Sequence, residues 1–130
     1  MRRLAQCHCG SLRATTSGDP VLVNMCHCEA CQRRTGALAG HGAAFPKAGV
    51  RIEGTSKVFE READEGRKVR FHFCPTCGTS LYWNADARPD WYFLAVGAFA
   101  DPDFPAPSVS IREASKHKWT LLPDGMSHLP

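Results

Sequence analysis

Seven of the 130 residues are cysteines, and all seven lie in three short clusters. The clusters are "CHCG" at residue 7, "CHCEAC" at residue 26 and "CPTC" at residue 74. An odd number argues against a disulfide scaffold, and two cysteines separated by one residue are too close to bridge each other easily. Clustered thiolates in a reducing compartment usually bind metal. We therefore expect a fold organised around metal sites.

The first and third clusters together predict one closed site. Cys74 and Cys77 form a zinc knuckle, a tight turn set by Pro75 in which backbone N–H groups can point at the sulfurs. Cys7 and Cys9 are two residues apart, so on an extended chain their side chains face the same way. The four thiolates would complete a tetrahedral structural zinc site. Such a site can supply a large part of a small domain's folding free energy.

The middle cluster offers only three thiolates, from Cys26, Cys28 and Cys31. Three protein ligands with an exchangeable fourth position, filled by water or a substrate thiol, are typical of catalytic zinc sites. The alternative is a second structural site whose fourth ligand comes from His41, His72 or a distant carboxylate. The spacing favours the open site, because the other four cysteines already satisfy one another.

Charged and aromatic side chains near the clusters allow two interpretations each. Arg33 and Arg34 follow Cys31 and could bind carboxylates of an acidic ligand, or could be ordinary solvent-facing arginines. Lys47 is a further candidate for such a contact. His8 and His27 lie between paired cysteines, and we expect them at the surface or beside the ligands. Four aromatic residues are interpreted as part of the hydrophobic core: Phe71, Trp83, Trp91 and Phe93.

The rest of the chain predicts a mainly β fold. "KVRFHFC" at 68–74 alternates apolar and polar residues, as a half-buried strand does. Short runs rich in β-forming residues predict further strands at 21–25, 80–83, 91–99 and 109–113. Only Glu29 to Thr35 predicts a helical turn. The mixed charges of 59–68 and the prolines of 101–107 predict loops. We expect a single domain of several small antiparallel sheets.

Composition narrows the class of protein. A net charge of +3 is too small and too scattered to indicate a nucleic-acid partner. No apolar run approaches the roughly 20 residues of a membrane helix. The first ten residues are basic but contain no apolar segment of the kind that directs secretion. We expect a cytoplasmic protein with no membrane partner, and exposed strand edges leave a homodimer open.

With these residues identified, the chain resembles the glutathione-dependent formaldehyde-activating enzyme family, whose domain also occurs in centromere protein V. The matching segments are "CHCGSL" at 7–12, "CHCEACQRRTGA" at 26–37, "FCPTCGTSLYW" at 73–83 and, more weakly, "REASKHKWTLLPDG" at 112–125. The resemblance implies one zinc domain over 1–130, with its motifs in about 5–125, and a β-tent fold around two zinc ions. It implies structural zinc on Cys7, Cys9, Cys74 and Cys77, and catalytic zinc on Cys26, Cys28 and Cys31.

Three functions remain in view at this point. The resemblance implies a carbon–sulfur lyase that joins formaldehyde and the co-substrate glutathione into S-hydroxymethylglutathione, or reverses that reaction. A second hypothesis is a non-catalytic zinc module that binds another macromolecule. A third is a thiol or metal sensor, because an open thiolate site with exchangeable metal is oxidisable.

Overall fold

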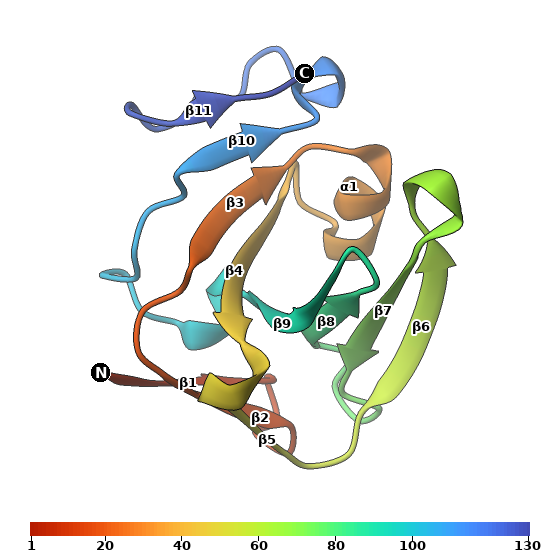
Figure 1. Cartoon of the computed structure of the whole chain (residues 1–130), viewed down its shortest axis with the longest axis vertical. Coiled ribbons are helices and arrows are strands. Elements are labelled where there is room, and N and C mark those ends of the chain that lie inside the picture. The colour runs from red at the N-terminus through yellow and green to blue at the C-terminus, as the bar shows by residue number, and fades with distance from the viewer.

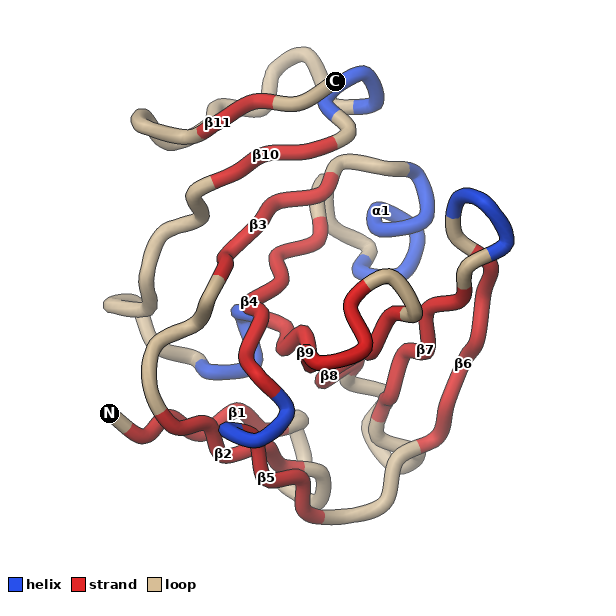
Figure 2. The backbone as a smooth tube through the Cα atoms, in the orientation of Figure 1, coloured by secondary structure: helices blue, strands red, loops and turns tan.

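The fold is mainly β, as predicted (Figures 1 and 2). The computed structural model describes the backbone of residues 1–130 and every side chain except that of Asp64. Its strands are β1 (Arg2–Gln6), β2 (Arg13–Ser17), β3 (Leu22–Cys26), β4 (Gly40–Pro46), β5 (Val50–Glu53), β6 (Lys57–Glu62), β7 (Lys68–Phe73), β8 (Ser80–Ala85), β9 (Arg88–Ala95), β10 (Val109–Ile111) and β11 (Ser127–His128). The α-helix is α1 (Glu29–Thr35), and short 3-10 helices are η1 (Lys47–Gly49), η2 (Asp64–Gly66), η3 (Val96–Phe99) and η4 (Glu113–Ser115).

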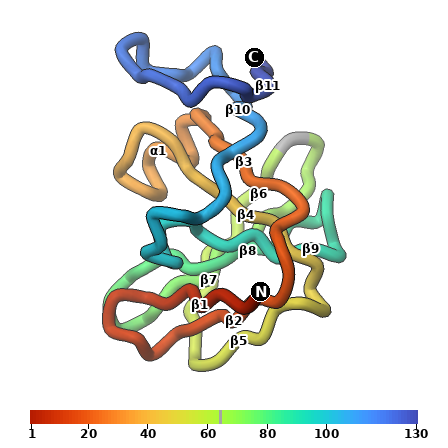
Figure 3. The backbone as a smooth tube through the Cα atoms, turned by 90° about the vertical axis from the view of Figure 1, so that its left-hand side faces the viewer, coloured from red at the N-terminus to blue at the C-terminus, as the bar shows by residue number. Residues whose placement is uncertain are grey.

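The strands form a three-stranded and an eight-stranded sheet. The smaller has the order β1-β2-β5 and is antiparallel throughout. The larger has the order β11-β10-β3-β4-β9-β8-β7-β6 and is mixed, because β10 runs parallel to both β3 and β11. It curves so that α1 lies between the β3–β4 part and the β6–β7 part (Figure 1). The smaller sheet lies at the end of the molecule opposite β10 and β11 (Figure 3).

The two faces of the larger sheet have different neighbours. Strand register places Tyr82, Leu94 and Ala43 side by side on one face, and these residues belong to the main core. Phe71 and Trp83 are paired on the other face, toward α1. The core joins the two sheets, and its fully buried members include Ala5, Leu12, Ala14, Phe45, Leu81 and Leu94.

The prediction of a loop at 59–68 is wrong for the first part of this segment, because β6 continues to Glu62. Its mixed charges pair with the neighbouring strand: Glu60 contacts Lys68 at 3.2 Å and Arg70 at 2.9 Å. Opposite charges on adjacent strands stabilise the pairing of those strands, so the charged pattern was compatible with an edge strand. The strand expected at 91–99 also ends early, because 96–99 form η3.

The helix has the bounds that the sequence predicted. The Sγ atom of Cys28 accepts a hydrogen bond from the backbone N–H of Cys31 at 3.3 Å and so caps the first turn. Gly36 ends the helix at φ 69°, a left-handed conformation that glycine adopts without steric cost. Two metal-ligand candidates are therefore positioned by the helix cap.

Candidate metal centres and the adjoining cleft

Cys7, Cys9, Cys74 and Cys77 come together in one group, with their Sγ atoms within 4.8 Å of one another. The Cys7 and Cys9 sulfurs are 3.7 Å apart, and the Cys9 and Cys74 sulfurs are 3.6 Å apart. A tetrahedron of Zn–S bonds of about 2.3 Å has sulfur–sulfur edges of about 3.8 Å. Donor type and spacing therefore fit a closed four-thiolate zinc site. It would join the start of the chain to the β7–β8 connection.

Hydrogen-bond donors surround this group. The hydroxyl of Ser11 lies 3.1 Å from Cys9 Sγ and 3.3 Å from Cys74 Sγ. The hydroxyl of Thr79 lies 3.4 Å from Cys77 Sγ. The Ser11 contact is the main reason why the pKa of Cys74 falls to about 7, and the Thr79 contact is the main reason why that of Cys77 falls to about 5. These donors stabilise thiolates, the form that binds metal.

Substitution of Ser11 by Ala is expected to weaken metal binding at this group by about tenfold or more, because groups that hydrogen-bond metal ligands typically contribute 10–100-fold. Competition with a chromophoric chelator would measure the change. Ser17→Ala, at the exposed end of β2, is the matched control. Equal metal affinity in the two variants would contradict a role for the hydroxyl.

Cys26, Cys28 and Cys31 form the second group, with sulfurs within 4.8 Å of one another. Cys26 ends β3, Cys28 caps α1 and Cys31 lies within its first turn. The Cys26 thiol donates a hydrogen bond to the Cys31 sulfur. This hydrogen bond, with a contribution from Arg34, lowers the pKa of Cys31 to about 5. The same sharing of a proton raises the pKa of Cys26. Without a metal cation, the three sulfurs therefore share protons among themselves. A bound cation would take the place of those protons.

Among the described side chains, no histidine or carboxylate joins these three sulfurs. His72, one candidate for a fourth ligand, uses both ring nitrogens elsewhere: Nδ1 is 3.0 Å from Ser56 Oγ and Nε2 is 3.1 Å from Asn84 Oδ1. His72 also stacks on Tyr82, on the core face of the sheet. His41, the other candidate, is exposed on β4 and lies outside the group.

The histidines between the paired cysteines also lie outside the metal groups. His8 is exposed. His27 is fully buried, and its Nε2 lies 2.8 Å from Ser110 Oγ on β10. The backbone N–H of His27 donates to the carbonyl of Ile111. His27 therefore fastens the Cys26–Cys28 loop to β10.

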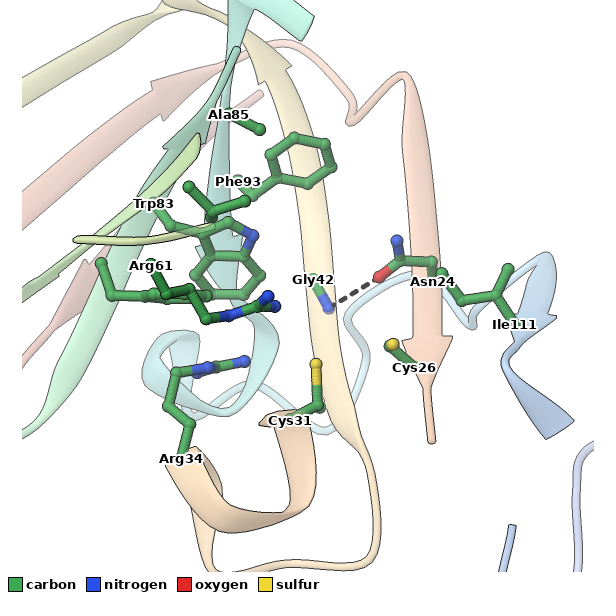
Figure 4. A pocket seen from close by; sticks show the side chains of 13 residues that line it. Asn24, Cys26, Cys31, Arg34, Gly42, Arg61, Trp83, Ala85, Phe93 and Ile111 are labelled. Carbon is green, nitrogen blue, oxygen red and sulfur yellow. Dashed lines mark hydrogen bonds between the residues drawn. The ribbon is translucent and has the colours of Figure 1, made fainter. Parts of the chain in front are cut away.

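Cys26 and Cys31 face a cleft with a volume of about 170 Å³ (Figure 4). Its aromatic wall is the face of the larger sheet turned toward α1, where Phe71, Trp83 and Phe93 are successive neighbours across β7, β8 and β9. The prediction that these rings are core holds for Phe71, which is buried. Trp83 and Phe93 are only half-buried. Apolar strand residues give the same sequence pattern whether they face a core or a cleft.

Arg34 extends from α1 over this wall. Its guanidinium lies 4.7 Å from the ring centre of Phe71 and 4.6 Å from that of Trp83. Its Nε atom is buried and has no hydrogen-bond partner among the described residues. Arg61 of β6 also lines the cleft, and its guanidinium carbon lies 5.5 Å from the ring centre of Phe71. Nothing in the sequence indicated this residue. Within the same described part of the chain, neither arginine has a carboxylate partner.

The other predicted cationic contacts are farther out. Arg33 is exposed and pairs with Glu29 at 3.4 Å. It borders a second hollow of about 470 Å³ that shares Arg34, Arg61 and Phe71 with the cleft. Lys47 lies over the Tyr92 ring at 5.1 Å and does not line the cleft.

Two glycines of β4 leave room at the base of the cleft. A Cβ atom on Gly42 would lie 2.8 Å from Trp83 Cζ2, and one on Gly40 would lie 3.0 Å from Arg34 Nη2. The backbone N–H of Gly42 donates to Asn24 Oδ1 at 3.3 Å (Figure 4). Because this bond occupies the amide oxygen, the NH₂ group of Asn24 is left to donate elsewhere. Asn24 lines the cleft and carried no recognisable signal in the sequence.

Comparison with known proteins gave one family and one fold. A family model described as "Glutathione-dependent formaldehyde-activating enzyme" matches residues 2–115. A crystal structure of a Rhodobacter sphaeroides protein, solved as a structural genomics target, is similar with a TM-score of 0.58 and 17% identity. The alignment covers 98% of this chain and 99% of that one, and at this identity it supports the fold alone. No curated protein matched the sequence. No helix in the described part of the chain has the length and hydropathy of a membrane span.

Proposed function

The chain belongs to the glutathione-dependent formaldehyde-activating enzyme family, and on that premise we propose that it is a zinc-dependent enzyme that forms or cleaves the carbon–sulfur bond of a glutathione-type thiol conjugate. Family membership supports a glutathione-related, formaldehyde-activating function at the level of the family. The finer assignment rests mainly on one observation. The group of Cys26, Cys28 and Cys31 has no fourth ligand among the described residues, and it borders the cleft.

The chemistry follows from the donor set. Zinc held by the thiolates of Cys26, Cys28 and Cys31 would supply Lewis acidity, which would lower the pKa of a thiol substrate in the cleft. The sulfur lone pair of the resulting thiolate attacks the aldehyde carbon, a C–S bond forms, and the carbonyl π electrons move to oxygen. That oxygen then takes a proton, so the product is a hemithioacetal. Cleavage is the reverse sequence. No electron donor or acceptor is needed.

Arg34 is the proposed contact for a carboxylate of the thiol substrate. It borders Cys31, its Nε has no partner among the described residues, and its stacking on two rings holds the guanidinium in one orientation. A guanidinium binds a carboxylate through two parallel hydrogen bonds. Arg61 is placed to assist, and Arg33 at the outer rim is the more exposed contact.

Asn24 is the proposed donor to the aldehyde oxygen. Its amide oxygen is held by Gly42, so its NH₂ group can donate to the negative charge that develops on oxygen when sulfur attacks. A donor fixed before the reaction stabilises that charge without reorganising. Asn24 and Cys26 both line the cleft from β3, where they are two residues apart and face the same side.

The proposal predicts that the metal-loaded protein accelerates the exchange of formaldehyde between its free form and S-hydroxymethylglutathione, which exchange NMR can measure above the uncatalysed rate. Arg34→Gln is expected to raise the KM for glutathione by about tenfold or more, because a hydrogen bond to a charged group is lost, and to change kcat little. Arg88→Gln is the matched control, since Arg88 also stacks on a tryptophan, Trp91, but does not line the cleft.

The competing hypotheses predict other results. A non-catalytic module would leave the exchange rate at its uncatalysed value and its metals unaffected by glutathione. A sensor would release or exchange its second metal on oxidation without accelerating the exchange. Either result would overturn the enzymatic assignment.

A further inference from the structure

We infer that the cleft accepts a thiol conjugate whose carbon portion is an apolar group about as large as a phenyl ring, well beyond the size of formaldehyde. The inference rests on the proposed function and specifies its substrate class. It comes from the half of the cleft whose lining residues carry no charge.

The cleft has two unlike halves on either side of the cysteine sulfurs. Arg34 and Arg61 occupy the side formed by α1, β6 and β7. The other side is formed by β10, β3, β4 and β9, and among its lining residues none is charged. Phe93 and the edge of Trp83 form one wall of this apolar slot, Ile111 and Asn24 form the facing wall, and Gly42 forms its base (Figure 4).

Aromatic rings form one wall of the slot. The rings of Trp83 and Phe93 stack nearly parallel, at 5° with centres 6.0 Å apart. Asn24 adds the amide group that faces the reacting oxygen in the proposed function. The lining is the kind that favours an apolar ligand with one polar atom near the sulfur.

The volume decides between a small and a large carbon group. A hydroxymethyl group adds two heavy atoms to the sulfur, and one water occupies about 30 Å³ in the liquid. An apolar cavity of about 150 Å³ is large enough to bind benzene. The whole cleft measures about 170 Å³, and the adjoining hollow of about 470 Å³ beside Arg33 leaves room for the tripeptide outside it. The cleft therefore offers more space than a formaldehyde-derived group would fill. Unfilled apolar space contributes nothing to binding, whereas a larger group would bury that surface.

Gly42 keeps the slot open. A methyl group at this position would meet the Trp83 ring at 2.8 Å and Asn24 Oδ1 at 3.1 Å, so either the ring or the base of the slot would have to move. An aromatic ring is a rigid neighbour. The absence of a side chain at Gly42 therefore sets the depth available to the carbon group.

The test compares two unreactive glutathione thioethers by isothermal titration calorimetry on the metal-loaded protein. S-benzylglutathione is expected to bind about tenfold or more tightly than S-methylglutathione, because it alone fills the slot with apolar surface. Gly42→Ala should reduce this ratio to near one, and Ile111→Ala, which keeps the backbone contact to His27, should reduce it about threefold. Val58→Ala, an apolar truncation at β6 on the other face of the sheet, should leave the ratio unchanged.

Each outcome has one consequence. Equal affinity for the two thioethers, or tighter binding of the methyl compound, would overturn this inference and leave the proposed function standing. A benzyl preference that Gly42→Ala and Ile111→Ala both preserve would also overturn it, because the phenyl group would then lie elsewhere. Binding of neither thioether would overturn glutathione as the co-substrate, and the inference with it.

Discussion

Cys74→Ser is expected to unfold the protein at ambient temperature. A structural zinc site contributes about 10–16 kcal/mol of apparent binding free energy, whereas a folded domain has only about 5–15 kcal/mol of net stability. Serine is nearly isosteric with cysteine but is a poor zinc ligand, so the variant would lose the metal without losing volume. Circular dichroism should show loss of the β signal, and metal analysis should show that the four-cysteine group no longer retains zinc.

Chelation of the wild-type protein is the companion measurement. A chelator strong enough to empty the four-cysteine group should unfold the wild-type protein at ambient temperature, as Cys74→Ser does, because both remove the same link between the chain start and the β7–β8 connection. A Cys74→Ser variant that keeps its metal content and its melting temperature would contradict a structural role for this group.

The cysteine groups could be predicted from the sequence because ligand chemistry is local. A knuckle requires two sulfurs within one turn, and the chain order of the clusters left few ways to combine them. The β strands at 68–73 and 22–26 were predictable for a related reason, since alternation and β-forming residues act over a few positions. The helical turn expected from Glu29 to Thr35 has the bounds that the structure shows.

The cleft could not be predicted because it depends on register across strands distant in sequence. Phe59, Phe71, Trp83 and Phe93 form one lateral row only because β6 to β9 pair in a particular alignment. Nothing in the segment around Arg61 distinguishes an arginine facing a ligand site from one facing solvent. Asn24 and Gly42 become informative only when the hydrogen bond between them is known. Chemistry that depends on long-range pairing therefore required the structure.

The extent of β6 was also not predictable from the sequence, because its residues from 59 onward were expected to form a loop. Its charged residues resembled a solvated loop, yet Glu60 pairs with two cations of β7. A pattern of mixed charge fits a loop and an edge strand equally well, and only the partner strand decides between them. That edge strand carries Arg61 into the cleft.

Cys28→Ser is expected to lower kcat by about 10²-fold or more while leaving the fold intact, a loss comparable to removal of a main electrostatic contributor to catalysis. Cys28 has two tasks in the structure: it belongs to the three-cysteine group, and its sulfur caps α1. Serine is among the best residues at a helix N-cap, so the substitution preserves the cap while it removes a thiolate. The effect on activity is thereby separated from an effect on the helix.

Cys28→Ser and Cys74→Ser form a matched pair, because one chemical change is made at each group. Cys28→Ser should lose the metal of the three-cysteine group, keep that of the four-cysteine group, and melt within a few degrees of the wild type. Metal analysis, thermal unfolding and the formaldehyde exchange rate would each report one of these results. If Cys28→Ser retained two tightly bound metal ions and full exchange activity, the three-cysteine group would not be the reaction centre. If it unfolded as Cys74→Ser does, both groups would be structural.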